Sequence, residues 1–258
     1  MNAFWLSFLA AAPSLLGTAA IAQTPPPPDQ PELVTGMEPF VGGMPPVEDR
    51  GVFAHALLNQ NEGRYDGINM QYRWSGEAWA GTDYNRLWIR TEGTVTKGRV
   101  EDGIQEFLFS RAITTFFDLQ GGLRSDLDSL PTRNWASLGI EGLAPGFFNI
   151  EATGYASTQG HLSARFESYY DLLITNRLIL QPQIELTFYS KSDPSREVGT
   201  GLSEIDAGLR LRYGFTRKLA PYIGVTYEGK YGQTANFAKQ AGQSTSDFRF
   251  TFGLRIWL

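Results

Sequence analysis

The sequence contains no cysteine, and it has only two histidines and four methionines in 258 residues. The absence of cysteine excludes a disulfide framework, a thiolate metal site and a cysteine nucleophile. The chain also lacks a net positive charge: the formal net charge is −5 and the pI is about 5.2. We therefore expect no nucleic-acid partner. After residue 22, no apolar run approaches the ~18 residues of a membrane-spanning helix, and no segment has a helical period.

The first fifty residues are predicted to lie outside the fold. Residues 3–22, "AFWLSFLAAAPSLLGTAAIA", are apolar and end in the small-x-small pattern of a signal-peptidase site. We expect residues 1–22 to be a signal peptide; an uncleaved anchor is the alternative, because the first residues lack Lys and Arg. Residues 23–50 are rich in proline and have no regular period, which predicts a flexible tail in the periplasm.

From residue 51 to 258 the dominant pattern has period two. In "DFRFTFGLRIWL" (247–258), alternate residues from Phe248 to Leu258 are apolar, and the intervening ones include Arg249 and Arg255. Successive side chains of a strand point to opposite faces, so such a segment has one apolar and one charged face. About twelve segments share the pattern: 52–63, 67–79, 84–96, 103–112, 116–126, 134–142, 147–157, 161–173, 178–190, 203–214, 220–231 and 247–258.

These segments predict an all-β fold, a transmembrane antiparallel β-barrel of about twelve strands in the outer membrane. Most are near the 9–11 residues that a tilted strand needs to cross a bilayer, and their number is even. A soluble lipocalin-like barrel also alternates and is the alternative. Aromatic residues near the segment ends favour the membrane, where they would form interfacial girdles: Trp79, Tyr84, Trp135, Tyr169, Tyr170, Tyr213, Tyr231 and Trp257.

Connections of alternating length predict the orientation. The second, fourth, sixth, eighth and tenth connections are short, as periplasmic turns are, and most of the others are longer and polar. The inward face carries interleaved charges of both signs, such as Arg86, Arg90 and Glu92. In a small barrel such charges are expected to pair and fill the lumen.

One pair of residues suggests chemistry at the lipid. His161 and Ser163 lie two apart on one strand, the spacing at which an imidazole activates a hydroxyl in outer-membrane lipid hydrolases. Here their face continues into Arg165, Glu167 and Asp171, which is the lumen side. We expect no enzyme activity; a lipid hydrolase and a general small-solute pore are kept as alternatives.

Several long blocks resemble a known family. They include "AGTDYNRLWIRTEG" (80–93), "FFDLQGGLRSD" (116–126), "WASLGIEGLAPGFFNIEATGY" (135–155), "GTGLSEIDAGLRLRY" (199–213) and "LAPYIGVTYEGKYGQTANFA" (219–238). In this order they are similar to the copper resistance protein B family of outer-membrane proteins. The resemblance implies a barrel that binds copper or passes it across the outer membrane, beside a periplasmic multicopper oxidase as partner.

The candidate copper ligands are few. Family members often carry a stretch rich in Met and His before the barrel, whereas residues 23–50 offer Met37 and Met44 and no histidine. The first strand adds His55. Two thioethers and an imidazole suit Cu(I), so we predict a weak copper site formed by Met37, Met44 and His55. A hydrogen-bonded lumen residue beside Asn59 is the alternative role for His55.

Overall fold

A computed structural model describes residues 51–127 and 132–258. The predicted signal peptide and tail, with Met37 and Met44, lie outside the described residues. Thirteen strands, two short helices and their connections make up the described part. The strands are β1 (Phe53–Tyr65), β2 (Met70–Gly81), β3 (Asn85–Thr96), β4 (Arg99–Ala112), β5 (Phe117–Asp126), β6 (Asn134–Ala144), β7 (Phe148–Ser157), β8 (Leu162–Tyr169), β9 (Leu172–Leu173), β10 (Leu178–Tyr189), β11 (Gly201–Tyr213), β12 (Leu219–Lys230) and β13 (Ser246–Trp257).

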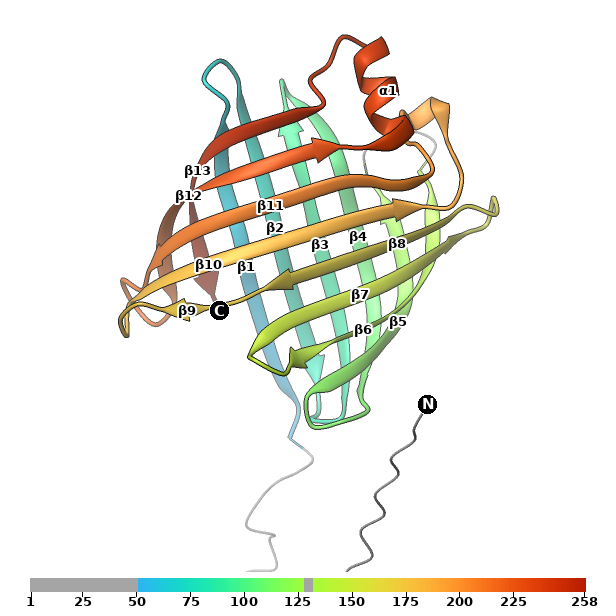
Figure 1. Cartoon of the computed structure of the whole chain (residues 1–258). Helices are drawn as coiled ribbons and strands as arrows, with labels where there is room; N and C mark the ends of the chain where they lie inside the picture. Colours follow the sequence, from blue (N-terminus) through green and yellow to red (C-terminus); the bar gives the residue numbers. More distant parts are fainter. Residues whose placement is uncertain (1–50, 128–131) are drawn as a thin grey trace, which may run out of the picture. The chain divides into compact units, whose positions relative to one another are not determined.

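The strands form one closed antiparallel sheet (Figure 1). Successive strands pair along the chain, and β13 returns to pair with β1. Both β8 and the two-residue β9 pair with β10, so together they fill one position in the wall. The wall therefore has twelve positions, as predicted. Closure leaves no unpaired edge, which a sheet in hydrocarbon requires.

The outer wall is apolar and the lumen is polar, as the period-two pattern predicts. Exposed apolar side chains cover the outside of many strands, among them Leu87, Ile89, Phe107, Phe109, Leu123, Leu138, Ile184, Leu209, Ile223, Val225, Phe248, Phe250, Phe252 and Leu254. The buried side chains are mostly polar or charged. A soluble barrel has the opposite arrangement, with apolar side chains inside and charged side chains outside. In a membrane the apolar side chains face the lipid, and the charged side chains pair with one another in the lumen.

One strand breaks the simple alternation. In β1 the pairing register shifts between Leu58 and Gln60 on the β2 side, and between Leu58 and Glu62 on the β13 side. Before the shift Leu57 is buried, and after it Gln60, Glu62 and Arg64 are buried. A bulge of this kind moves a strand's side chains from one face to the other, so alternation alone does not predict the lumen face of β1.

The two ends of the barrel differ. One end has five short connections (82–84, 113–116, 145–147, 174–177 and 214–218), and we call it the short-turn end. The other, the long-loop end, has the connections 190–200 and 231–245, which contain a 3-10 helix (Pro194–Arg196) and α1 (Gly232–Gln240) (Figure 1). The five short turns at one end are therefore confirmed. The prediction of long connections at the other end is correct only in part, because 66–69 and 158–161 are short and the third connection, 97–98, is a two-residue turn.

The helix α1 corrects the expectation that the chain has no helix. It has only nine residues, most of them exposed, so its sequence carries no apolar stripe to read. Its buried residues are Thr234 and Ala238, and Thr234 Oγ1 accepts a 2.8 Å hydrogen bond from the backbone N–H of Gly199. The helix thus depends on tertiary contacts rather than on its own period. Among the residues described, no helix is long and apolar enough to span a membrane.

Four of the five short connections share one turn. In each, a threonine hydroxyl accepts a hydrogen bond from the backbone N–H three residues later, at 2.9–3.2 Å, and its own N–H donates to the carbonyl of that residue. These threonine turns are at Thr82, Thr114, Thr175 and Thr216. The hydroxyl satisfies a backbone donor that would otherwise lack a partner, which stabilises a tight turn locally.

The predicted aromatic girdles are correct only in part. Tyr84 and Tyr213 are exposed, as a girdle requires, but Trp135 is 3% exposed and donates from Nε1 to Asp126 at 2.9 Å. Trp257 lies under the Arg255 guanidinium, 4.9 Å from its ring centre. The pattern contained this signal, because Trp257 follows Arg255 by two residues and so shares its charged face.

Candidate functional site: an ion-paired lumen

Two cavities in the described part of the chain lie in the lumen. The first, of about 210 Å³, is lined from strands near the short-turn end, and we call it the short-turn cavity. The second, of about 900 Å³, is lined also by residues of the long connections, such as Asp193, Thr234 and Gln243, and we call it the long-loop cavity. Glu92, Ile104 and Arg165 line both cavities, so these side chains lie where the two meet.

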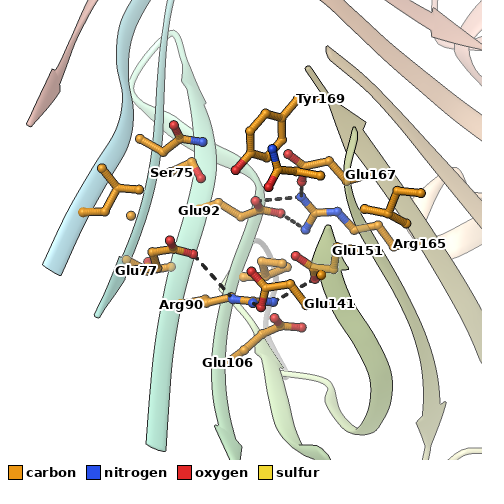
Figure 2. Close-up of a pocket in the computed structure, with 18 of the residues that line it drawn as sticks. Ser75, Glu77, Arg90, Glu92, Glu106, Glu141, Glu151, Arg165, Glu167 and Tyr169 are labelled. Atoms are coloured by element: carbon orange, nitrogen blue, oxygen red, sulfur yellow. Dashed lines mark hydrogen bonds and ion pairs between the residues drawn. The ribbon is translucent and has the colours of Figure 1, made fainter. Parts of the chain in front are cut away.

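An ion pair occupies that boundary. Arg165 on β8 binds both carboxylate oxygens of Glu92 on β3, with Nη2 2.8 Å from Oε2 (Figure 2). The same guanidinium lies 3.0 Å from Glu185 Oε1 and 3.3 Å from Glu167 Oε2. A bidentate arginine–carboxylate pair is among the strongest charge-assisted contacts. It lies at the boundary of the two cavities, and we call this ion pair the partition.

A second network of hydrogen bonds joins β1 to strands that are not its direct neighbours in the wall. Glu62, 1% exposed, accepts hydrogen bonds from Arg64 Nε at 2.7 Å, Arg210 Nε at 3.0 Å and the Tyr222 hydroxyl at 2.9 Å. Every one of these partners is a donor to the ionised carboxylate. Such a network orders the side chains that it joins and links β1 to strands beyond its direct neighbours.

Carboxylates form a continuous row across eight successive wall positions. Each faces the next across a pair of strands, because the strand register aligns them. We call the row the acidic ladder; it runs Asp118, Glu141, Glu151, Glu167, Glu185, Asp206, Glu228, Asp247. Directly opposed residues have Cβ atoms about 4.5–5.5 Å apart, and like charges at that spacing repel. The ladder is therefore an unfavourable arrangement unless cations neutralise it.

Arginines supply part of that neutralisation. Arg90, for example, has Nη2 2.5 Å from Glu141 and Nη1 2.8 Å from Glu151 (Figure 2). The eight ladder carboxylates share six arginines: Arg64, Arg73, Arg86, Arg90, Arg165 and Arg249. Three of these, Arg64, Arg90 and Arg165, also bind carboxylates outside the ladder. Negative charge is thus in excess along the row.

The short-turn cavity has the same excess. Its lining contains six glutamates and three arginines. Glu106 is 2% exposed, and its Oε1 has no hydrogen-bond partner in the part of the chain that the structure describes. Its cross-strand neighbours Arg90 and Arg124 bind other carboxylates instead: Arg124 Nε lies 3.0 Å from Asp126 Oδ1. A buried carboxylate without a partner favours a proton or a cation.

The predicted metal ligands are only partly described. His55 lies on β1 at the short-turn end, half-buried, with its ring centre 6.1 Å from that of Trp79. Met37 and Met44 lie outside the described residues, so their approach to His55 stays a prediction. Within residues 51–127 and 132–258, no three His, Asp or Glu side chains are placed to hold a metal ion directly.

His161 and Ser163 do not form a catalytic pair in the described residues. His161 lines the long-loop cavity, and Ser163 is buried, with a hydroxyl that has no hydrogen-bond partner in the described structure. Both therefore lie on the lumen side, away from a lipid substrate.

Sequence reasoning identified the ladder residues but not the ladder. Period two places Asp118, Glu141 and the others on the inner face one strand at a time; which of them oppose one another depends on strand register. Glu106 was missed, because its inward neighbours Ile104 and Leu108 are apolar and hide the register of β4. The outward Phe107 and Phe109 are the signal that could have identified it.

A closed antiparallel barrel with an apolar outer wall and an ion-paired lumen is an integral barrel of the kind found in outer membranes. Residues 52–258 match the family model described as "Copper resistance protein B precursor (CopB)". The chain is 39% identical to Copper resistance protein B of Escherichia coli over 211 residues, 82% of this chain and 71% of that protein. It is 37% identical to the Copper resistance protein B homolog of Pseudomonas syringae pv. tomato (strain ATCC BAA-871 / DC3000), over 82% of this chain and 72% of that one. The chain belongs to the copper resistance protein B family.

A solved structure, the NanC porin in a rhombohedral crystal form, superimposes with a TM-score of 0.49 at 12% identity, covering 79% of this chain and 99% of that chain.

Proposed function

We propose that the barrel serves copper resistance by binding copper ions in its lumen and passing them across the outer membrane. The observation that carries the proposal is the excess of carboxylate in the short-turn cavity, six glutamates against three arginines. A cavity of one sign walled by protein concentrates ions of the other sign. Membership of the copper resistance protein B family supports copper as that ion.

The proposal includes an orientation. The short-turn end faces the periplasm, as short turns do in bacterial barrels, and β1 begins at that end with Phe53. The tail of residues 23–50 then extends into the periplasm, where a multicopper oxidase acts as partner. The apolar outer wall contacts the lipid of the outer membrane.

A weak copper site at this end is part of the proposal. Its ligands are Met37, Met44 and the imidazole of His55, and its preferred ion is Cu(I), because thioethers are soft ligands. Support comes from the half-buried position of His55 at the short-turn end. A flexible tail of this length spans about 5–6 Å times the square root of its residue number, so its methionines reach that end.

The test is growth on copper of a deletion strain that carries the wild-type gene or the triple variant Met37→Leu, Met44→Leu, His55→Ala. We expect the wild type to restore tolerance and the triple variant to restore it only in part. The control is Met70→Leu, since Met70 is an exposed methionine on β2. Barrel levels are compared by heat-modifiable mobility on gels. Full tolerance with the triple variant would remove this site, and no gain from the wild type would remove the copper function.

A general small-solute pore is the second candidate, and the size of the long-loop cavity favours it. The partition at Arg165 and Glu92 opposes it, because a solute wider than an ion has to break that pair. Sugar uptake by proteoliposomes separates the two candidates. For the lipid-hydrolase alternative, the measurement is fatty-acid release by the wild type and by Ser163→Ala; we expect none from either.

A further inference from the structure

The acidic ladder climbs the full height of the barrel. Asp118 is the second residue of β5, beside the short-turn end, and Asp247 is the second residue of β13, beside the long-loop end. Between them the carboxylates lie progressively farther from the short-turn end, because strands in a barrel are tilted and a row across them rises. The row therefore connects one mouth of the lumen to the other.

The ladder also lines the two cavities in order. Glu141, Glu151 and Glu167 line the short-turn cavity. The next four members line the long-loop cavity: Glu185, Asp206, Glu228 and Asp247. The change from one cavity to the other falls between Glu167 and Glu185, and Arg165 contacts both. The partition thus lies on the ladder itself.

A structural role alone does not account for eight like charges in a row. The same barrel contains a row of alternating sign, in which Glu77, Arg90, Glu106 and Arg124 oppose one another across β2 to β5. Alternation is the arrangement that lowers the electrostatic energy of a lumen wall. The ladder departs from it over two thirds of the wall, which points to a requirement other than stability.

Glu106 provides an independent observation. It is not a ladder member, and it is only 2% exposed. It lines the short-turn cavity, and its Oε1 has no hydrogen-bond partner among the described residues. Around the same cavity lie Glu141 and Glu151, which in the described residues share one cationic partner, the guanidinium of Arg90 (Figure 2). Their other partners are neutral: Gln120 donates to Glu141 and Thr153 donates to Glu151. A cation in this cavity would neutralise Glu106 and the surplus of the two ladder carboxylates together.

We propose that the acidic ladder is a conduction path for hydrated divalent cations and that the cavity beside Glu106 is a resting position on it. The inference rests on the proposed function only where it takes copper to be the conducted ion. The conducted copper ion is Cu(II), because oxygen donors select hard or borderline ions. The ion keeps its water, since no three carboxylates in the described residues converge on one point. At about 30 Å³ per water, a cavity of about 210 Å³ has room for a hydrated ion.

Arginines on this path act as resident counter-ions. When a cation arrives, it neutralises the carboxylate in place of the guanidinium. The long arginine side chain then moves aside, while the carboxylate stays on the wall. At the partition, Arg165 releases Glu167 and Glu185 and keeps its ion pair with Glu92. Selection is by charge, so Mn²⁺ follows the same path as Cu²⁺ and an anion such as chloride does not.

The experiment measures cation entry into proteoliposomes that contain the barrel and a trapped dye quenched by Cu²⁺ and by Mn²⁺. Variants are Glu106→Gln, which breaks no ion pair, Glu151→Gln on the ladder, and Asn149→Arg, which adds a cation to the same cavity lining. The control is Asp83→Asn, an exposed carboxylate in a short turn. Folding is checked by heat-modifiable mobility. We expect each variant to slow entry of both ions about tenfold and the control to match the wild type.

Each outcome decides the inference. Slow entry in the folded variants supports the path. Entry at wild-type rates in Glu106→Gln and Glu151→Gln overturns it and leaves the copper function standing. A wild type that passes Mn²⁺ but not Cu²⁺, with slow variants, supports the path and removes copper as its cargo. A folded wild type that passes neither ion overturns the path.

Discussion

The guanidinium of Arg165 on β8 binds the carboxylate of Glu92 on β3 across the lumen, with Nη2 2.8 Å from Oε2. The two strands are five positions apart around a wall of twelve. Because both residues line both cavities, this contact lies at the boundary of the two cavities. We expect the strength of this ion pair to determine how readily the two cavities connect.

We expect Arg165→Gln to open the partition and to destabilise the barrel. The change leaves Glu92, Glu167 and Glu185 without this guanidinium, and removing one partner of a buried pair costs about 3–5 kcal/mol. Single-channel conductance in planar bilayers should rise, and the urea midpoint of unfolding should fall. Adding Glu92→Gln should restore part of the stability while the conductance stays high. Equal conductance in wild type and both variants would show that the barrier lies elsewhere.

A charged side chain should destabilise the barrel when it is placed on the outer wall, but not when it is placed in the lumen. Leu209→Arg places a guanidinium on the exposed apolar face of β11 and should cost about 2–4 kcal/mol near the bilayer midplane. Asn149→Arg places the same group in the short-turn cavity among glutamates and should fold almost normally. Unfolding in lipid vesicles, followed by tryptophan fluorescence, measures both. A similar loss for the two would mean that the assignment of faces is wrong.

The threonine turns should contribute locally to stability. Thr114→Ala removes the acceptor of hydrogen bonds from Phe116 and Phe117, at 3.2 and 2.9 Å. A hydrogen bond of this kind contributes about 0.5–1.5 kcal/mol, so the unfolding free energy should fall by about that amount. The exposed neighbour Thr115 offers a matched control as Thr115→Ala. Identical losses in the two variants would rule out a role for the turn hydroxyl.

Acid should weaken the connection between β1 and β2. The backbone N–H groups of Asn69 and Ile68 donate to the Asp66 carboxylate at 2.6 and 2.7 Å and hold its pKa below the ordinary value of 3.8. The ionised form is favoured by folding, so its stabilisation is complete well above 3.8 and is lost as the pH falls through the lower, folded pKa. The difference in unfolding free energy between wild type and Asp66→Ala should therefore be present at pH 7 and shrink below pH 3.8. A difference that is constant with pH would contradict this.

The barrel could be predicted from the sequence because its rule is local. A strand in lipid needs an apolar face of fixed period and length, and each segment carries that information by itself. The closed pairing of the strands and the short-turn end could be predicted from the same segments. The helix α1 could not be predicted in this way, since its buried Thr234 hydrogen-bonds to Gly199 and Ser203, far away in the chain. Trp135 was misassigned because position near a strand end outweighed its place on the charged face.

The lumen was predictable residue by residue but not as an arrangement. Glu92 and Arg165 were both placed inside, yet the contact between them depends on closure of the barrel. The row from Asp118 to Asp247 depends on seven strand registers in sequence. Registers arise from turns and bulges together, such as the shift in β1. The period-two pattern of separate segments therefore does not predict them.

The seam between β1 and β13 has a consequence for how the chain assembles. Among the described strands, every other pairing joins neighbours along the chain, if β8 and β9 are counted as one position, so those hairpins can form in turn with little cost in loop-closure entropy. The seam joins Phe53–Tyr65 to Ser246–Trp257 and brings together the two ends of the sheet. Until it closes, each molecule carries two complementary free edges, and a second molecule offers the same two. Exchange of strands between molecules therefore competes with closure, and it gains as the local concentration of unfinished barrels rises.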